Sequence, residues 1–544
     1  MTPETKNKLE SLNSTLELIE KYYHACAVIS YDMETICPEK GMEAQGELEA
    51  LLGNEAFKLR KDEKFIEAAE YLYEHRDELD PSDRILVKQL HRGYLQDKNI
   101  TPEKQMEFSL IYNKAFVDWT NARKESNFAL FADSLAAVDK AGKEMIELRE
   151  EDPEDEPGMS VYDKMLNDYE RGMTSKRLDA TFERCKEVLV PMLKKITESK
   201  KSIRRDFLNI EVTDEQQKKM ADYLLEVLGF DFTRGAYTTS EHPFTNGLAK
   251  DDTRVTTHYY PTEFASSMYS IIHEGGHALF EQLQPQEDFD HHIQDYKTLG
   301  MHESVSRFYE NRIGRSKAFI HLIYPKVCEI FPQVMRAEEY YKQQKLSANK
   351  ETGSVNALSD QQENSSCPAG TIKNVTEEEL YLALNIAEPS LIRTEADEFT
   401  YTLHIIIRYV IEKEIVGGTL AIADIPKRWK EKYREYLGIE PATDREGVLQ
   451  DVHWSSGFGY FPTYAIGNMY NSMYYNLMKQ EFDIDAAVEA GDFGRINGWM
   501  KEHVFAKANR LDPAEWIKDL TGREFTPEDF LEYIKEKFTG IYDL

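Results

Sequence analysis

Cysteine and long apolar runs are scarce in this sequence, and their scarcity excludes several classes of protein. The 544 residues include only five cysteines, an odd number without metal-binding spacing, so we expect reduced thiols rather than a disulfide framework. No stretch approaches the ~18 to 20 apolar residues of a membrane helix, and residues 1–20 lack the apolar core of a signal peptide. We therefore expect a cytoplasmic protein with no membrane partner. The cysteines are Cys26, Cys37, Cys185, Cys328 and Cys367.

Basic residues are also few compared with acidic ones. The chain has 66 Lys and Arg against 98 Asp and Glu, which gives a net charge of −32. A field of this sign repels phosphate backbones, so we expect no nucleic acid partner. Hydrophobic residues still make up 41% of the chain, enough to fill a large core and to exclude global disorder.

Alternating strand patterns are rare, and most of the chain has helical periodicity. In residues 8–22 four apolar side chains recur near a 3.6-residue period: Leu9, Leu12, Leu16 and Ile19. The best strand candidate is 254–260, which is rich in β-branched and aromatic residues and ends at Pro261. We therefore expect a mainly α fold with a small β element.

Two segments have the composition of connectors. Residues 150–158 form an acidic stretch with Pro and Gly, and residues 347–373 are polar and free of aromatic side chains. Helix resumes at Thr376, which begins a capping-box pattern. Neither connector separates segments with distinct chemistry. We expect residues 1–544 to form one large helical domain, with 347–373 as an exposed loop insertion.

Residues 273–277 spell His-Glu-Gly-Gly-His, an H-E-x-x-H motif flanked by a helical apolar stripe. Residues at i and i+4 lie on one helix face about 6 Å apart, so His273 and His277 can bind one metal ion. Glu274 lies ~100° further round the helix. It can therefore reach a metal-activated water without ligating the metal. This arrangement is typical of a metallohydrolase.

The motif is more specific than its length indicates. The chain has 14 His, and Glu makes up roughly a tenth of its residues. In a chain of this composition the H-E-x-x-H pattern is expected about 0.04 times by chance, so a false match is rare. The two central glycines are also unusual, because each costs ~1 kcal/mol in a helix interior. Their missing side chains predict a close approach by another backbone or by a substrate.

A catalytic zinc site uses three protein ligands and keeps one position open. Residues 290–292 (Asp-His-His) lack the spacing of a third histidine ligand found in related motifs. The segment after Gly300 provides two candidates, His302 and Glu303, on a stretch with helical pattern. We favour Glu303 and expect His302 to be a packed or supporting histidine.

Six short signatures, taken in order, resemble the thermostable carboxypeptidase Taq family of metallocarboxypeptidases over nearly the whole chain. H-E-x-x-H alone leaves many metalloprotease families open, whereas six signatures in the family's order are very specific. They are H-P-F (242–244), D-x-R-x-T (252–256), H-E-x-x-H (273–277), H-E-S (302–304), I-R-x-x-A-D (392–397) and G-x-x-Q-D-x-H-W (447–454).

The resemblance implies a helical subunit with two lobes around a deep active-site groove, usually a homodimer. It implies a carboxypeptidase of broad specificity that removes single residues from peptides with a free C-terminal carboxylate, C-terminal Pro excepted. One divalent metal per subunit is implied, Zn²⁺ or else Co²⁺, with His273, His277 and Glu303 as ligands and Glu274 as catalytic base. The chain departs from the family pattern at Val305 and Tyr31.

Further site residues are expected around these signatures. For the tetrahedral oxyanion we favour Tyr460 or Tyr464, with His453 assisting, by analogy with related helical peptidases. For the substrate carboxylate we favour Arg393, with Arg254 as second choice and His242 also assigned to substrate binding. The strand at 254–260 is expected along the cleft, where it could pair with an extended substrate.

Two other functions are compatible with the motif. A related helical zinc endo- or oligopeptidase would use the same three ligands, and a non-enzymatic acidic scaffold could retain a dead site. The intact base and ligands argue against the scaffold. The order of the six signatures favours the carboxypeptidase over both.

Overall fold

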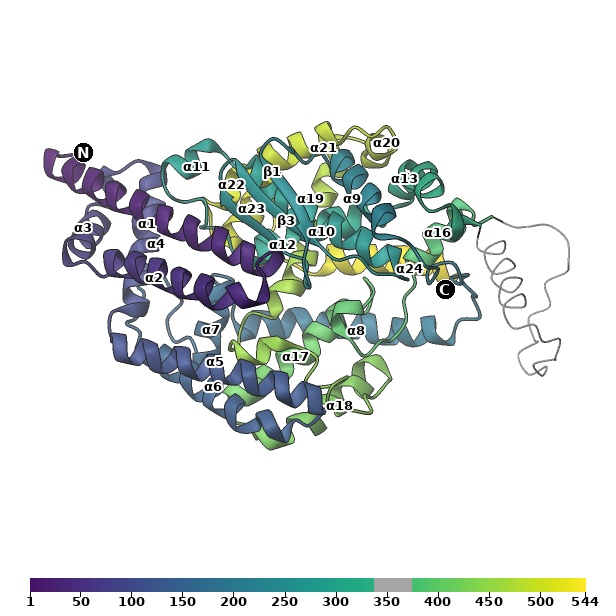
Figure 1. Ribbon diagram of the computed structural model, residues 1–544, viewed down its shortest axis with the longest axis horizontal. Helices are drawn as coiled ribbons and strands as arrows, with labels where there is room; N and C mark the ends of the chain where they lie inside the picture. Colours follow the sequence, from purple (N-terminus) through teal and green to yellow (C-terminus); the bar gives the residue numbers. More distant parts are fainter. Residues whose placement is uncertain (337–373) are drawn as a thin grey trace, which may run out of the picture.

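The computed structural model describes residues 1–336 and 374–544, and the described part is built of helices around one three-stranded sheet (Figure 1). The mainly α fold with a small β element is therefore confirmed. The expected loop insertion at 347–373 lies outside the described residues. None of the described helices combines the length and hydropathy of a bilayer-spanning segment.

The first four helices form an N-terminal bundle, seen in purple and blue in Figure 1. The expected apolar stripe of residues 8–22 is buried in this bundle. These side chains join a hydrophobic cluster of their own, separate from the main core. The helices are α1 (Pro3–Thr35), α2 (Met42–Arg60), α3 (Glu63–Glu74) and α4 (Pro81–Asp97).

A short segment of the main body joins the N-terminal bundle. Ile293 is fully buried in the bundle's hydrophobic cluster. Just before it in the chain, His291 Nδ1 lies 2.7 Å from Asp83 Oδ1 and His292 Nδ1 lies 2.7 Å from Glu20 Oε1. One apolar contact and two histidine–carboxylate contacts therefore help to hold the bundle against the rest of the chain.

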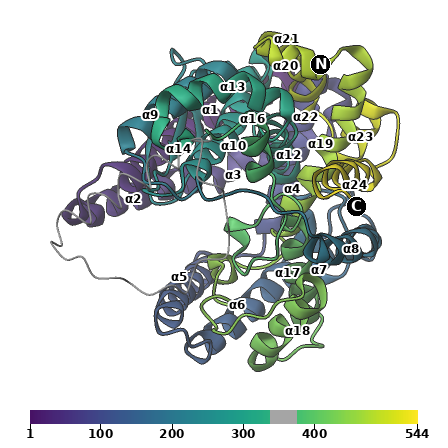
Figure 2. The same ribbon diagram turned by 90° about the vertical axis from the view of Figure 1, so that its right-hand side faces the viewer.

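The main body has two lobes, which Figure 2 shows one above the other. The connector at 150–158 is free of helix, as expected, and lies in the lower lobe. One hydrophobic cluster extends through both lobes. The lower lobe contains α5 (Pro102–Glu125), α6 (Ala129–Glu147), α7 (Val161–Tyr169), α8 (Ser175–Glu198), α17 (Tyr401–Val416) and α18 (Ile425–Leu437).

The upper lobe contains the sheet and most of the remaining helices. Thr376 caps its helix with the reciprocal bonds of a capping box, as the sequence predicted. The helices of the upper lobe are α9 (Asp214–Leu228), α10 (Phe264–Leu283), α11 (Gln286–Asp290), α12 (Leu299–Arg307), α13 (Lys317–Ile330), α14 (Pro332–Met335), α16 (Glu377–Leu384), α19 (Pro462–Glu481), α20 (Ile484–Glu489), α21 (Phe493–Met500), α22 (Ala506–Ala508), α23 (Pro513–Thr521) and α24 (Glu528–Tyr542).

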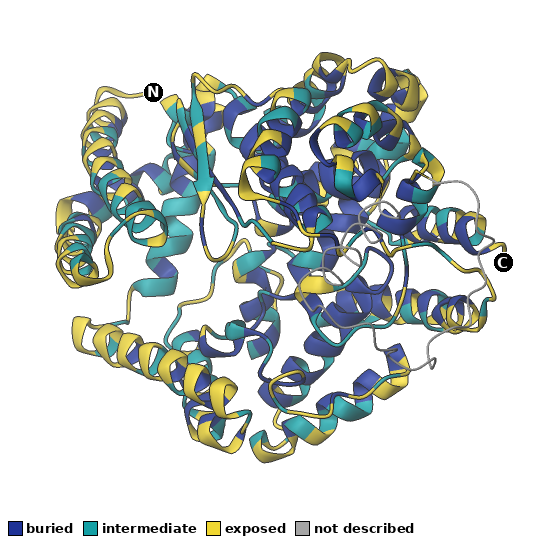
Figure 3. Ribbon diagram, turned by 45° about the vertical axis from the view of Figure 1, so that its right-hand side comes forward, coloured by how far each residue is buried: buried dark blue, intermediate teal, exposed yellow. Residues whose placement is uncertain are grey.

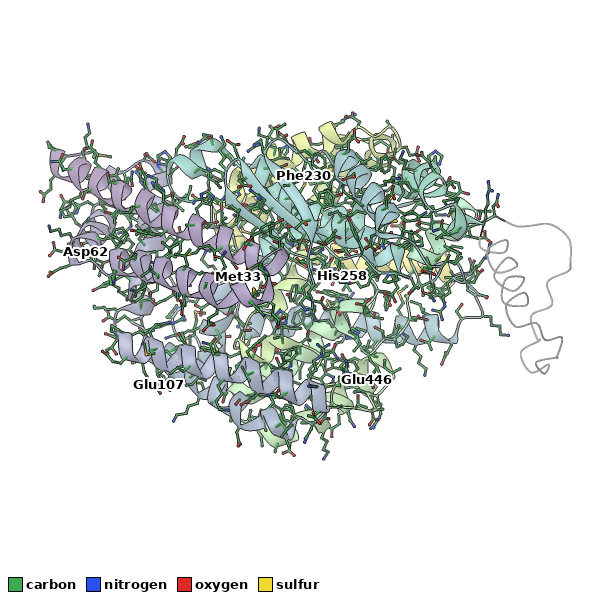
Figure 4. The ribbon with its side chains drawn as sticks, in the orientation of Figure 1. Met33, Asp62, Glu107, Phe230, His258 and Glu446 are labelled. Carbon is green, nitrogen blue, oxygen red and sulfur yellow. The ribbon has the colours of Figure 1, made fainter. Side chains whose placement is uncertain are left out.

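The sheet has the order β1-β3-β2. Strand β1 (Gly235–Thr239) pairs in parallel with β3 (Asp252–Thr257), and β2 (Thr245–Ala249) pairs with β3 in antiparallel. The strand expected at 254–260 is observed as β3, which begins two residues earlier and ends at Thr257. His258 therefore lies past the end of β3, near the middle of the molecule (Figure 4). Because both edges of β3 are occupied, the idea that this strand pairs with substrate is wrong.

Helices α10, α12 and α19 form the centre of the fold, where Figure 3 shows mostly buried residues. Glycine allows the closest of these contacts. A Cβ at Gly467 of α19 would lie 2.9 Å from Cγ of Glu303 on α12. Any larger residue there would push α12 and its glutamate away, so α19 fixes the position of the candidate ligand.

Glu170, just after α7, supports the start of α12 from the other lobe. Its carboxylate accepts hydrogen bonds from the backbone N–H of Gly300, at 2.9 Å, and from Tyr470 Oη, at 2.8 Å. Burial raises the pKa of Glu170 to about 7, although these hydrogen bonds oppose the shift. The ionised form is therefore costly in the folded protein.

Replacing Glu170 should change how stability depends on pH. Between about pH 4.5 and 7 the folded protein keeps the Glu170 proton and the unfolded chain loses it, so the free energy of unfolding falls as pH rises. Over this window the loss is on the order of 3 kcal/mol. Glu170→Gln should gain that much relative to wild type between pH 5 and 8 in urea unfolding. Equal pH slopes for wild type, Glu170→Gln and the exposed-site control Glu532→Gln would contradict the assignment.

Candidate metal centre

The two histidines of the H-E-x-x-H motif lie on one face of α10, as the spacing predicted. Glu303 approaches them from α12, with Oε2 3.6 Å from His273 Nε2 and 3.4 Å from His277 Nε2. These three side chains form a group whose ligand atoms are close enough to hold one ion. His302, the other candidate for third ligand, does not belong to that group and contacts His277 Nδ1 instead.

The motif's glycines bring the two helices together. A Cβ at Gly276 would lie 2.8 Å from the backbone Cα of Ser306 on α12, and one at Gly275 would lie 3.1 Å from two leucine side chains of α9. The expectation that another backbone approaches is confirmed at Gly276, whereas Gly275 meets side chains. Gly276 therefore sets the distance between the histidine pair and Glu303.

Gly276→Ala should weaken metal binding and turnover. The added methyl group must push α12 off α10, because the atom it meets belongs to the backbone. A displacement of about 1 Å at a reacting centre lowers kcat by roughly 100-fold. Chelator competition and kcat measure the effect, with Gly53→Ala of α2 as control, since no atom lies within 4 Å of that Cβ. A Gly276→Ala enzyme within threefold of wild type in both would contradict this role.

Two further charged residues on the same helical stretch support the ligands. Glu310 Oε2 lies 2.8 Å from His273 Nδ1, which orients the ring so that Nε2 faces Glu303. Arg307 donates to Glu303 Oε1 at 2.7 Å and to Glu310 Oε2 at 3.0 Å. Sequence reasoning missed both residues. Their spacing of four and seven from Glu303, on one helix face, was an available signal.

These contacts determine the charges around the centre. Burial alone would raise the pKa of Glu310, but Arg307 and His273 lower it to about 2. The same balance, with Arg307 and the two histidines opposing burial, keeps the pKa of Glu303 well below its usual range. Both carboxylates are therefore ionised, the form that a cation requires.

Glu274 is held by the sheet, ~100° round α10 from His273. It is buried, and Thr245 Oγ1 of β2 donates to its Oε2 at 2.7 Å. Glu274 is not among the residues that can hold the ion. The carboxylate is thus fixed beside the candidate metal site and free to accept a proton. Thr245 had no signal in the sequence.

The I-R-x-x-A-D and G-x-x-Q-D-x-H-W signatures contact each other. Arg393 Nη2 lies 2.8 Å from Asp451 Oδ1, and the Arg393 backbone N–H donates to Gln450 Oε1 at 2.8 Å. The third side of the guanidinium, Nη1, lies 3.3 Å from Tyr401 Oη. The guanidinium of Arg307 lies over the Tyr401 ring. Tyr401 therefore contacts both Arg393 and the arginine that holds Glu303.

The expected oxyanion donors lie together. The rings of Tyr460 and Tyr464 are 5.1 Å apart, and Tyr464 Oη lies 3.4 Å from His453 Nε2. Burial raises the pKa of Tyr460, and the charge of Glu303 adds to the shift, so this phenol lies within electrostatic reach of the centre. A cavity of about 350 Å³ adjoins them. It is lined by Tyr169, Glu412, His453, Ser456, Gly457, Tyr460 and Phe461.

The other two expected substrate-binding residues belong to the sheet region, one on a strand and one on a loop. Arg254 of β3 is partly exposed and paired with Asp252, with Nη2 2.9 Å from Oδ2. Its guanidinium also lies 5.7 Å from the ring centre of Tyr31 on α1, one of the positions that departs from the family pattern. His242 is exposed on the loop between β1 and β2.

A second group in the described part of the chain could also hold an ion. It consists of Asp80, Asp83 and His291, at the junction with the N-terminal bundle. His291 Nδ1 lies 2.7 Å from Asp83 Oδ1 and 4.0 Å from Asp80 Oδ1. This group has no counterpart of Glu274, and it already serves the junction.

Comparisons with known proteins agree with the geometry. Residues 11–350 and 362–538 match the family model described as carboxypeptidase Taq (M32) metallopeptidase. The chain is 34% identical to carboxypeptidase 1 of Bacillus subtilis over 97% of both chains, and 31% identical to thermostable carboxypeptidase 1 of Thermus thermophilus over 100% of both. The crystal structure of M32 carboxypeptidase from Deinococcus radiodurans superposes with a TM-score of 0.87 at 27% identity, covering 99% of this chain and 100% of that one.

Proposed function

Because this chain belongs to the carboxypeptidase Taq (M32) family of metallopeptidases and is a metal-dependent carboxypeptidase, we propose that His273, His277 and Glu303 hold its divalent metal ion. The observation that carries this proposal is the convergence of both Nε2 atoms on Glu303 Oε2. The residues fit such an ion. The two Nδ1 atoms and Glu303 Oε1 already have partners, which leaves the remaining lone pairs directed at a common point.

We propose Zn²⁺ as the ion, with Co²⁺ as the alternative. Two imidazoles and one carboxylate are the ligand set of several catalytic zinc sites in peptidases. Nitrogen and oxygen donors of this kind also suit neighbouring divalent metals, so availability decides between them. One ion per subunit is expected.

Glu274 is proposed as the general base and acid of peptide hydrolysis. When bound, the metal ion supplies Lewis-acid polarisation of the scissile carbonyl. The Glu274 carboxylate, held by Thr245, takes a proton from the attacking water. The same carboxyl group then gives this proton to the leaving amine, so one residue serves both steps.

Tyr460 is proposed as the donor to the developing oxyanion, with Tyr464 and His453 in support. Its phenol borders the cavity and is influenced by the charge of Glu303. Burial lowers the pKa of His453 to about 4, so this imidazole is neutral at pH 7. A neutral ring accepts from Tyr464 at 3.4 Å and helps to orient the tyrosine pair.

Arg393 is proposed to bind the C-terminal carboxylate of the substrate. Asp451 occupies Nε and Nη2, at 3.0 and 2.8 Å, and fixes the guanidinium plane. The Nη1 side keeps one long contact, to Tyr401, and is the side on which a carboxylate would bind. Arg254 is the second choice for this role, and His242 is also proposed to bind substrate. We also propose broad specificity without release of C-terminal Pro.

We further propose that the enzyme is a cytoplasmic homodimer and that residues 1–544 act as one catalytic domain around an active-site groove. The family resemblance supports the dimer and the groove. The acidic composition and the scattered cysteines support the cytoplasmic location.

An exopeptidase assay tests the proposal. An N-blocked peptide with a free C-terminus is incubated with Zn²⁺-loaded, Co²⁺-loaded and chelator-treated enzyme, and free amino acid is measured. We expect metal-dependent release that disappears when the peptide is C-terminally amidated. Internal cleavage that is indifferent to amidation would instead support the oligopeptidase alternative.

A further inference from the structure

The two histidine ligands have different partners behind them. His273 has the Glu310 carboxylate 2.8 Å from its Nδ1. His277 has another imidazole there, because its Nδ1 lies 2.5 Å from Nδ1 of His302. The two rings are nearly parallel, with centroids 4.6 Å apart and planes 25° apart.

The far nitrogen of His302 meets a charged carboxylate. His302 Nε2 lies 2.6 Å from Glu281 Oε1, and Lys297 Nζ lies 3.5 Å from the same oxygen. The other oxygen, Oε2, accepts from Gln284 Nε2 at 2.7 Å. Side chains of Lys297 and Glu281 are only 7% and 15% exposed, so the ammonium compensates the carboxylate in a largely dry site.

For two neutral imidazole rings beside an ionised carboxylate, these contacts leave one direction for the hydrogen bonds. An ionised carboxylate accepts only, so the His302 proton is on Nε2 and is donated to Glu281. Nδ1 of His302 is then a lone pair. Nδ1 of His277 must carry a proton and donate it, which leaves Nε2 of His277 as the unprotonated, ligating nitrogen. In any other arrangement of the two neutral rings, two N–H groups or two lone pairs face each other.

The surrounding elements hold His302 in this position. The Phe280 ring meets it edge-on, with centroids 4.9 Å apart. A Cβ at Gly247 of β2 would lie 2.6 Å from Glu281 Oε2, so a larger residue there would have to shift that carboxylate. Strand β2 and helices α10 and α12 thus all contribute to one arrangement.

We propose that His302 is a positioning residue that fixes the tautomer and ring orientation of His277 through a relay to Glu281 and Lys297. This inference rests on the metal centre proposed above. It assigns the H-E-S signature two roles in adjacent residues, since Glu303 binds the ion and His302 prepares its neighbouring ligand. His302 itself is not among the residues that could hold the ion.

Two substitutions separate the hydrogen bond from the shape of the ring. His302→Phe keeps a planar ring and removes the acceptor for His277. His302→Asn places an amide oxygen near the Nδ1 position and restores that acceptor. His91→Phe is the matched control, because His91 is a half-buried histidine paired with Glu70 in the N-terminal bundle.

The readouts are Zn²⁺ affinity by chelator competition, the visible absorption spectrum of the Co²⁺ form, and the melting temperature of the metal-free protein. We expect His302→Phe to lose about 10- to 100-fold in affinity with an altered Co²⁺ spectrum. His302→Asn should retain most of the affinity, and His91→Phe all of it. The metal-free melting temperatures show whether His302→Phe is folded.

Each outcome has a defined meaning. Wild-type affinity and an unchanged Co²⁺ spectrum in His302→Phe would overturn the inference while leaving the proposed function intact. If His302→Phe does not fold, His302→Asn decides, because a loss as large as that of removing a ligand would contradict a positioning role. A wild-type protein that takes up no metal would overturn the proposed function and this inference together.

Discussion

Glu274→Gln should abolish turnover while leaving the metal ion in place. The amide keeps the size of the carboxylate and can still accept from Thr245, so the fold and the ligands are preserved. It cannot take a proton from water or return one to the leaving amine. Because both proton transfers depend on this group, we expect kcat to fall about 1,000-fold or more.

The measurement pairs kcat for release of the C-terminal residue with metal content per chain. Glu263→Gln is the control, because Glu263 caps the same helix, α10, at an exposed position. We expect its kcat and metal content to equal those of wild type. If Glu274→Gln kept more than a tenth of the wild-type kcat, another group would have to be the base.

Glu303→Gln should produce the largest loss of metal binding. The substitution removes the charge that faces the two imidazoles and leaves Arg307 with Glu310 as its remaining charged partner. A cation site with two neutral histidines and a nearby guanidinium is electrostatically unfavourable. Since changes behind a ligand already cost 10- to 100-fold, loss of the ligand should exceed about 100-fold in affinity.

Chelator competition with Zn²⁺ measures this loss, and the melting temperature of the metal-free protein checks the fold. Glu378→Gln, at an exposed site on α16, is the control. Stoichiometric metal binding with wild-type affinity in Glu303→Gln would mean that the third ligand is another residue. Arg307 would then support the metal ligands only through Glu310 and His273.

Local pattern predicted the parts of the site that lie on single helices. The spacing of His273 and His277 required one helix face, and the glycines between them indicated a close neighbour, which is the backbone at Ser306. Glu303 was identified by its helical context together with the family resemblance. The three side chains lie together as expected, because helix geometry fixes which residues share a face, and their roles as ligands stay predictions.

Contacts between distant segments were not predictable in the same way. Thr245 meets Glu274 only because β2 packs on α10, and the sequence carries no mark of that pairing. The strand at 254–260 was recognised as a strand but not as the central one, since alternation says nothing about neighbours. The Arg393–Asp451 pair likewise joins two motifs that lie far apart in the chain.

Every proposed catalytic step depends on one metal ion bound between His273, His277 and Glu303. Anomalous diffraction at the zinc edge, from crystals grown with Zn²⁺, tests this most directly. We predict one anomalous peak per chain at bonding distance from His273 Nε2, His277 Nε2 and Glu303 Oε2. A peak at Asp80, Asp83 and His291, with none on α10, would contradict the proposed metal centre.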